Sequence, residues 1–277
     1  MNFKIGVRGH DMLSKSEPSS FFKAIKEEGF SRVQLVFPKA FATYSYDDVF
    51  VSEVKAELDK NEITVSMLGA YFNPVHSDKE VVRKGIENFK NNLRIAKLFG
   101  NAPVGSETGS YNDSPWTYVP KNHTEEGYQE TLSVFKGLVE YAESLGSFIT
   151  VEPAFNHVIY SSEVLKRFVS DLDSPNVFVT IDLYNLLSLE NCMRHKELFH
   201  EALSTFGNKI KILHLKDFVK KNNEIIQVAP FRGEFDYPYM ISEIKQYCPD
   251  ATMIFEGVKK DEIAMSLSAL QTCIQHC

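Results

Sequence analysis

Short hydrophobic runs alternate with longer amphipathic segments along the whole chain. The runs are four to six residues long and rich in β-branched residues, which is typical of buried parallel strands. We expect eight such strands, at residues 3–7, 32–37, 63–68, 102–105, 148–151, 177–181, 210–213 and 252–255.

The segments between these runs carry apolar residues at helical spacing. Helices are predicted at residues 19–29, 78–99, 124–145, 162–172, 194–206, 237–247 and 261–275. Gly100, Gly146 and Gly207 each follow such a segment, as glycines that end helices commonly do. Eight strands alternating with helices, without a linker-like segment between them, predict one α/β domain over residues 1–277, a (β/α)8 TIM barrel.

Length, composition and charge limit the partners and the compartment that we expect for the protein. The chain has 277 residues, close to the roughly 250 that are typical of this fold. A formal net charge of −7 argues against nucleic acid as a partner. The sequence shows no apolar run of the roughly 18 residues that a membrane span requires, no signal peptide, and no paired spacing of its four cysteines. We therefore expect a cytoplasmic protein, and whether it forms a homo-oligomer is left open.

Four residues at strand ends are the most informative feature of the sequence. Glu152, Asp182, His214 and Glu256 each stand at the C-terminal end of a predicted strand, 30, 32 and 42 residues apart. The C-terminal ends of barrel strands converge on one mouth, and three carboxylates gathered there repel one another unless a cation or protons intervene. A divalent metal site is the economical interpretation. The alternative is pairing with Lys or Arg, which is less favoured because few basic residues lie close by in sequence.

Two long irregular stretches are expected at the same mouth, at residues 106–122 and 218–238. The first contains Trp116, the only tryptophan, and its aromatic content favours an ordered lid or wall. The second contains Arg232 and follows the predicted strand that carries His214.

The same residues resemble those of the xylose isomerase-like TIM barrel superfamily, especially its sugar phosphate isomerase/epimerase group. The matching pieces are Val-Glu152-Pro with His157 five residues on, Ile-Asp182 with Asn185, His214-Leu-Lys216-Asp217, Arg232-Gly-Glu-Phe-Asp-Tyr, Phe-Glu256-Gly, and Ser-Glu107-Thr-Gly. Two positions depart from the family pattern. The ketose 3-epimerases carry a histidine where this chain has Asn185, and many members carry a glutamate where this chain has Gln34.

The resemblance implies a divalent-metal-dependent isomerase or epimerase that acts on a small sugar or sugar-like polyhydroxy carbonyl compound through an enediolate. Glu152, Asp182, His214 and Glu256 would hold one ion, and Glu152 and Glu256 would also transfer the proton. Three carboxylates and one imidazole suit Mn²⁺, Mg²⁺, Co²⁺ or Zn²⁺, and the sequence does not choose among them.

Seven further residues are candidates to bind the sugar: His10, Glu107, Trp116, His157, Asn185, Lys216 and Arg232. Arg232 is the best single candidate to hold a substrate oxygen with two donors, although a solvated surface charge is an equal alternative. Lys216 is expected on the same side of its strand as His214, where it would neutralise a substrate oxygen or another carboxylate.

Three other functions fit parts of the pattern. A metal-dependent dehydratase of an inosose-like substrate would use the same metal and base, and a non-catalytic sugar-binding barrel would explain Asn185 and Gln34. Apurinic endonucleases share the barrel but use more strand-end histidines than this chain offers, and its net charge is −7.

Overall fold

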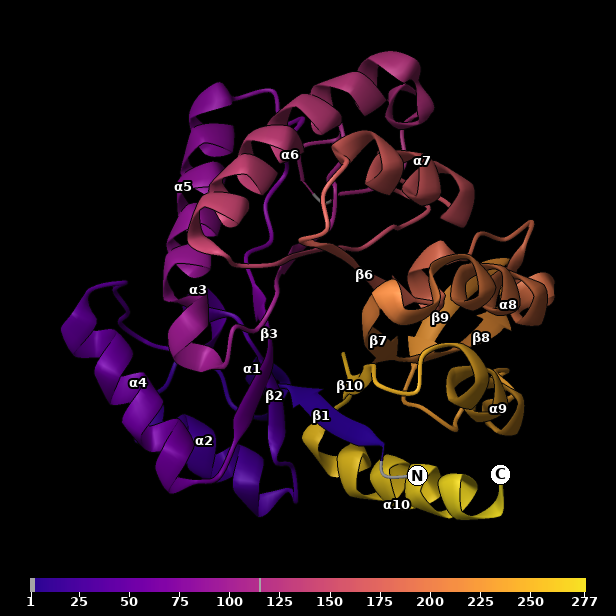
Figure 1. Ribbon diagram of the computed structural model, residues 1–277. Coiled ribbons are helices and arrows are strands. Elements are labelled where there is room, and N and C mark those ends of the chain that lie inside the picture. The colour runs from indigo at the N-terminus through magenta and orange to yellow at the C-terminus, as the bar shows by residue number, and fades with distance from the viewer. Residues whose placement is uncertain (1–2, 115) are drawn as a thin grey trace.

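Eight parallel strands close into a barrel in the computed structural model, which describes residues 3–114 and 116–277 (Figure 1). Around the barrel the strands follow the order β1-β10-β7-β6-β5-β4-β3-β2. Their bounds are β1 Lys4–Arg8, β2 Arg32–Leu35, β3 Thr64–Gly69, β4 Val104–Ser106, β5 Ile149–Val151, β6 Val177–Asp182, β7 Ile210–Leu215 and β10 Thr252–Phe255. The predicted TIM barrel is confirmed, and each of the eight expected strands overlaps one of these.

The helices form an outer ring around the strands (Figure 1). The α-helices are α1 Gly9–Met12, α2 Pro18–Glu27, α3 Phe37–Ala40, α4 Asp48–Lys60, α5 Lys79–Ile95, α6 Glu125–Leu145, α7 Ser162–Leu172, α8 His195–Phe206, α9 Tyr237–Tyr247 and α10 Lys260–His276. The 3-10 helices are η1 Ala96–Phe99, η2 Pro120–His123, η3 Tyr184–Leu186, η4 Cys192–Arg194 and η5 Gly207–Lys209. Within residues 3–114 and 116–277, no helix combines the length and hydrophobicity needed to cross a membrane.

Local signals in the sequence account for where several helices begin and end. The side chains of Asp78, Thr124 and Ser161 accept hydrogen bonds from the first-turn amides of α5, α6 and α7. Gly146 ends α6 with φ 62°, a left-handed conformation that glycine adopts without steric cost.

Alternation along each strand sends every second side chain into the barrel. The interior of the barrel contains a buried cluster of Met67, Ile212 and Ile254. Gly105 has no space for a β-carbon because the side chain of Met67 occupies that position. His214 lies two residues beyond Ile212 on β7, on the same side of the strand. The apolar cluster therefore lies next to the polar C-terminal end of the barrel.

The stretch 218–238, expected to be irregular, contains an antiparallel hairpin. Its strands are β8 Asp217–Lys221 and β9 Glu224–Val228. Asn222 and Asn223 join them with φ values of 51° and 60°. Two consecutive residues with positive φ are what a type I′ hairpin turn requires, and asparagine tolerates that conformation better than most residues.

Candidate active site

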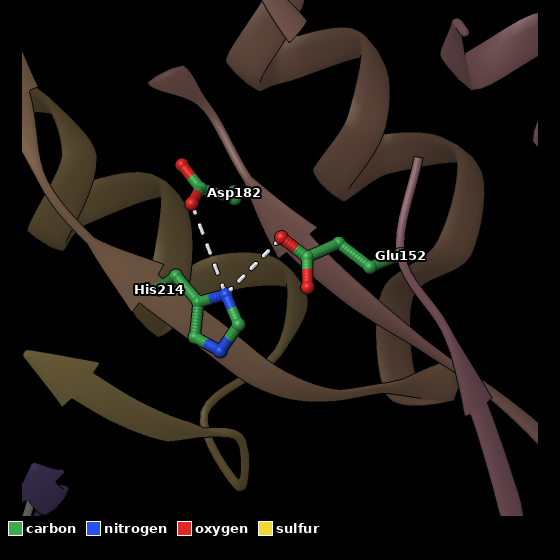
Figure 2. A group of neighbouring side chains, drawn as sticks. All are labelled: Glu152, Asp182 and His214. Carbon is green, nitrogen blue, oxygen red and sulfur yellow. Dashed lines mark hydrogen bonds and ion pairs between the residues drawn. The ribbon is translucent and has the colours of Figure 1, made fainter. Parts of the chain in front are cut away.

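Glu152, Asp182 and His214 meet at the C-terminal mouth of the barrel (Figure 2). Glu152 follows β5, Asp182 ends β6, and His214 on β7 is the direct strand partner of Asp182. One ligand atom from each of the three lies within 4.8 Å of the others. His214 Nδ1 is 3.2 Å from Glu152 Oε1 and 3.8 Å from Asp182 Oδ2.

Glu256 joins this group from β10, the neighbour of β7 on the other side. Its Oε2 lies 2.8 Å from His214 Nδ1. The imidazole nitrogen therefore faces carboxylates from three different strands, and all four side chains are buried. The structure brings together the four residues that the sequence pattern selected.

The other imidazole nitrogen, Nε2, donates a hydrogen bond to Gln34 Oε1 at 2.7 Å. Gln34 is itself held by Tyr71, whose hydroxyl accepts from Gln34 Nε2 at 2.8 Å. A neutral His214 with its proton on Nε2 presents a free lone pair on Nδ1, the form that a metal ligand requires.

The chemistry of this donor set fits a divalent cation. Glu152 Oε2 is buried and has no hydrogen-bond partner in the described part of the chain. Leaving a buried carboxylate oxygen unsatisfied is costly, and a metal ion would satisfy it. Oxygen and imidazole donors together suit the divalent ions named above.

Two basic residues also contact the carboxylates, so the less favoured pairing with Lys or Arg is present, and Lys216 lies beside other carboxylates as one of its two expected roles requires. Lys216 Nζ is 2.7 Å from Asp182 Oδ2 and 3.0 Å from Glu256 Oε1. Arg8 Nη1 is 2.6 Å from Glu256 Oε1. Lys216 points inward two residues after His214, and Arg8 arrives because β1 pairs with β10 when the barrel closes.

These cations do not balance the negative charge of the site. Glu152, Asp182 and Glu256 place three carboxylates here against Lys216 and Arg8. Arg8 is shared further, because its guanidinium also pairs with Asp11 at 2.8 Å. The remaining negative charge is what a bound divalent ion would neutralise.

Protonation in the metal-free cluster follows from the same charges. Burial opposes the charged form of His214, but Glu256 and Glu152 outweigh it and raise the pKa of the imidazole to about 10. For Glu256, burial disfavours ionisation, yet His214 and Lys216 hold the pKa of the carboxyl well below its usual range. Without a metal, His214 is therefore an imidazolium that takes part of the cation's place.

Asn185 links the cluster to the residues around it. Its Nδ2 donates to Glu152 Oε1 at 2.9 Å and lies 3.4 Å from Glu107 Oε1, while its Oδ1 accepts from Lys216. Burial and the neighbouring Glu152 raise the pKa of Glu107 well above its usual range. Asn185 thus fixes one oxygen of Glu152 and leaves the other free.

Two hollows open beside the cluster. The first has a volume of about 410 Å³, and its lining includes Arg8, His10, Lys39, Tyr71, Glu107, Glu152 and Glu256. The second has a volume of about 880 Å³, and its lining includes Glu107, Trp116, Tyr118, Phe155, His157, Tyr184 and Asn185. Glu107 borders both hollows, and Trp116 packs edge-on against His157 with ring centroids 5.6 Å apart.

A family model described as xylose isomerase-like TIM barrel matches residues 22–273. The chain belongs to this family. No curated protein sequence shows significant similarity to it.

Three solved structures are similar to this chain over nearly its whole length. The 3-keto-D-glucoside 4-epimerase of E. coli has TM-score 0.73 and 17% identity, over 98% of this chain and 100% of that one. An L-ribulose 3-epimerase has TM-score 0.75 and 12% identity, over 99% and 95%. The IOLI protein, whose structure contains a zinc atom, has TM-score 0.73 and 16% identity, over 99% and 96%. At these identities the likeness establishes the fold.

Arg232 lies away from the site in this xylose isomerase-like barrel. Its side chain is exposed, contacts Met265 of α10 and lines neither hollow. The reason is Asp217, which accepts hydrogen bonds from the backbone of Gly233 and Phe235 at 2.9 and 3.0 Å. Those bonds fold the turn so that Arg232 points outward, as in the alternative of a solvated surface charge, and away from both hollows.

The remaining candidates line one hollow or the other. His10 borders the first, Trp116 and His157 border the second, and burial lowers the pKa of both histidines to about 4. Both imidazoles are therefore neutral at neutral pH. Sequence reasoning missed Tyr71, which follows β3 by two residues, and its place just beyond a strand end is the signal that points to it.

Proposed function

We propose that this chain is a divalent-metal-dependent isomerase or epimerase that acts on a small sugar or sugar-like polyhydroxy carbonyl compound. The observation that carries the proposal is the position of Glu152 and Glu256. Both line the first hollow, and both also reach Nδ1 of the same histidine, His214. The base and the acid are thereby held at the edge of the site that would contain the cation.

Glu152, Asp182, His214 and Glu256 are the residues that would hold the ion. When bound, the ion supplies positive charge that polarises a carbonyl group and makes the hydrogen on the adjacent carbon more acidic. Relatives named as sugar epimerases and one that contains zinc support this assignment.

The proposed reaction exchanges a proton at a carbon atom. One of the two glutamates removes the hydrogen next to the carbonyl, and the other returns a proton to the carbon skeleton. Return to the same carbon from the opposite face inverts its configuration and gives an epimer. Return to the former carbonyl carbon, with transfer of the hydroxyl proton to the former carbonyl oxygen, exchanges an aldose and a ketose. The first hollow, at about 410 Å³, lies in the roughly 300–1,000 Å³ range of small-molecule sites.

The test is a turnover screen with product identification. Free ketoses, aldoses, inososes and keto-glycosides are incubated with the protein and Mn²⁺, and products are identified by NMR and mass. Interconversion at constant mass that stops with a chelator and in Glu152→Gln supports the proposal. A product lighter by one water would indicate a dehydratase, and no turnover of any compound at full metal occupancy would favour a non-catalytic sugar-binding barrel.

A further inference from the structure

The two hollows lie on different sides of one hydrogen-bonded group. Residues at the ends of β1, β2 and β3 line the first hollow, and the loops after β4, β5 and β6 line the second together with the tip of the β8–β9 hairpin. Glu107 borders both, and Asn185 contacts Glu107 and Glu152 from the side of the second hollow. The two hollows are therefore adjacent, and Glu107 is the lining residue that they share.

The volumes differ in a way that matters for substrate size. The first hollow, of about 410 Å³, contains both proposed proton-transfer residues. The second, of about 880 Å³, contains neither Glu152 nor Glu256, yet by volume it is a full-sized ligand site in its own right. A free monosaccharide reacting in the first hollow would leave the second one empty.

The second hollow has the chemistry of a site for a neutral carbohydrate. Trp116, Tyr118, Phe155 and Tyr184 supply aromatic surface of the kind that packs against the C–H faces of a sugar. Asn156, Ser188 and Asn223 add neutral hydrogen-bonding groups at its edge.

Charge argues against an anionic group in this space. Among the described residues that line the second hollow there is no lysine or arginine, and Glu107 and Glu224 are acidic. Phosphate recognition normally uses Arg or Lys donors. A phosphorylated substituent would therefore meet carboxylates and no cation.

We propose that the substrate is a glycoside, with the reacting sugar in the first hollow and a second, uncharged sugar unit in the second. This inference rests on the proposed function for the position of the reacting carbon. It names a substrate class larger than a free monosaccharide and excludes a phosphate on the second unit.

The test is equilibrium binding by calorimetry to the Mn²⁺-loaded protein. D-glucose and D-fructose are compared with sucrose, maltose and cellobiose. At least one disaccharide is expected to bind about tenfold more tightly than its component monosaccharides. Equal or weaker binding of every disaccharide, or no binding by any of them, would overturn the inference.

A matched pair of tyrosine variants tests whether the second hollow causes the tighter binding of the disaccharide. Tyr118, which is 44% exposed, lines the second hollow, whereas Tyr44, which is 42% exposed, lines neither. Tyr118→Ala should bring the disaccharide and monosaccharide Kd values to within about twofold, and Tyr44→Ala should preserve the difference. Equal weakening of both ligand classes by Tyr118→Ala would contradict the assignment. Because binding needs no turnover, failure of the enzymatic proposal leaves this outcome readable.

Discussion

Gln34 accepts a hydrogen bond from Nε2 of His214 at 2.7 Å, and this contact turns the other imidazole nitrogen toward three carboxylates. An amide oxygen fixes the same tautomer as a carboxylate does, but adds no negative charge beneath the cluster.

The first prediction concerns this contact. Gln34→Leu removes the acceptor and should weaken Mn²⁺ binding by about 10- to 100-fold, because His214 loses the partner that orients it. Gln34→Glu keeps the acceptor and should retain binding. The measurement is Mn²⁺ titration followed by electron paramagnetic resonance. Equal affinity in the leucine variant and the wild type would show that the contact does not orient a ligand.

Metal binding should release a proton. The pKa of His214 is raised to about 10, so the metal-free imidazole stays protonated at every pH below that value, and the ion must displace its proton. Apparent affinity should therefore rise by about tenfold per pH unit between about pH 7 and 9. Calorimetric titration in buffers of different ionisation enthalpy measures the proton directly. A binding heat independent of the buffer would count against His214 as a ligand.

The strands were predictable because a barrel strand is buried on both faces and leaves an uninterrupted apolar run. The helix α4 was not predicted, although Val51, Val54 and Leu58 are buried at helical spacing. The consecutive Val49, Phe50 and Val51 favour a strand as much as a helix, and only packing decides between them. The hairpin had a readable signal in Asn222-Asn223, which precede Glu224-Ile-Ile-Gln-Val, a segment rich in β-branched residues.

The cluster of Glu152, Asp182, His214 and Glu256 was predictable for a different reason, since every member stands at the C-terminal end of a strand and these ends meet at one mouth of the barrel. The place of Lys216 beside other carboxylates was also expected, because it lies two residues after His214 on the same side of the strand. The contact of Arg8 with Glu256 was not predicted. Arg8 lies 248 residues from Glu256, and their contact depends on how the first and last barrel strands pair. Likewise, the outward direction of Arg232 depends on the bonds of Asp217 to a turn 16 to 18 residues away.

Lys216 should stabilise the metal-free protein more than the metal-bound one. Lys216→Met leaves Asp182 and Glu256 buried without their nearest cation and should cost about 3 kcal/mol in the absence of metal. A bound divalent ion should recover much of that loss. The measurement is urea unfolding with Mn²⁺ and with a chelator.

A surface lysine provides the control. Lys260 lies 3.3 Å from Glu28 and its side chain is 56% exposed, so Lys260→Met should cost at most about 1 kcal/mol under both conditions. If Mn²⁺ stabilised the Lys216→Met variant no more than the wild type, the carboxylates would not be gathered around a cation site.

The hairpin turn should be sensitive to side-chain shape. Asn222 has φ 51°, so Asn222→Val should destabilise the hairpin by about 1–2 kcal/mol, whereas Asn222→Gly should be nearly neutral. Hydrogen exchange of the β8 and β9 amides measures the effect locally. Equal protection in the two variants would show that the turn does not require positive φ.

Solvent deuterium incorporation reports whether Glu152 and Glu256 transfer a proton at a carbon next to a carbonyl. A substrate found in the screen is incubated in D₂O with the Mn²⁺-loaded protein, and deuterium at that carbon is followed by NMR. We expect deuterium incorporation with the wild type. The rate of incorporation should fall by at least about 100-fold in Glu152→Gln and in Glu256→Gln. Turnover without deuterium incorporation, or undiminished incorporation in both variants, would contradict this role of the two glutamates.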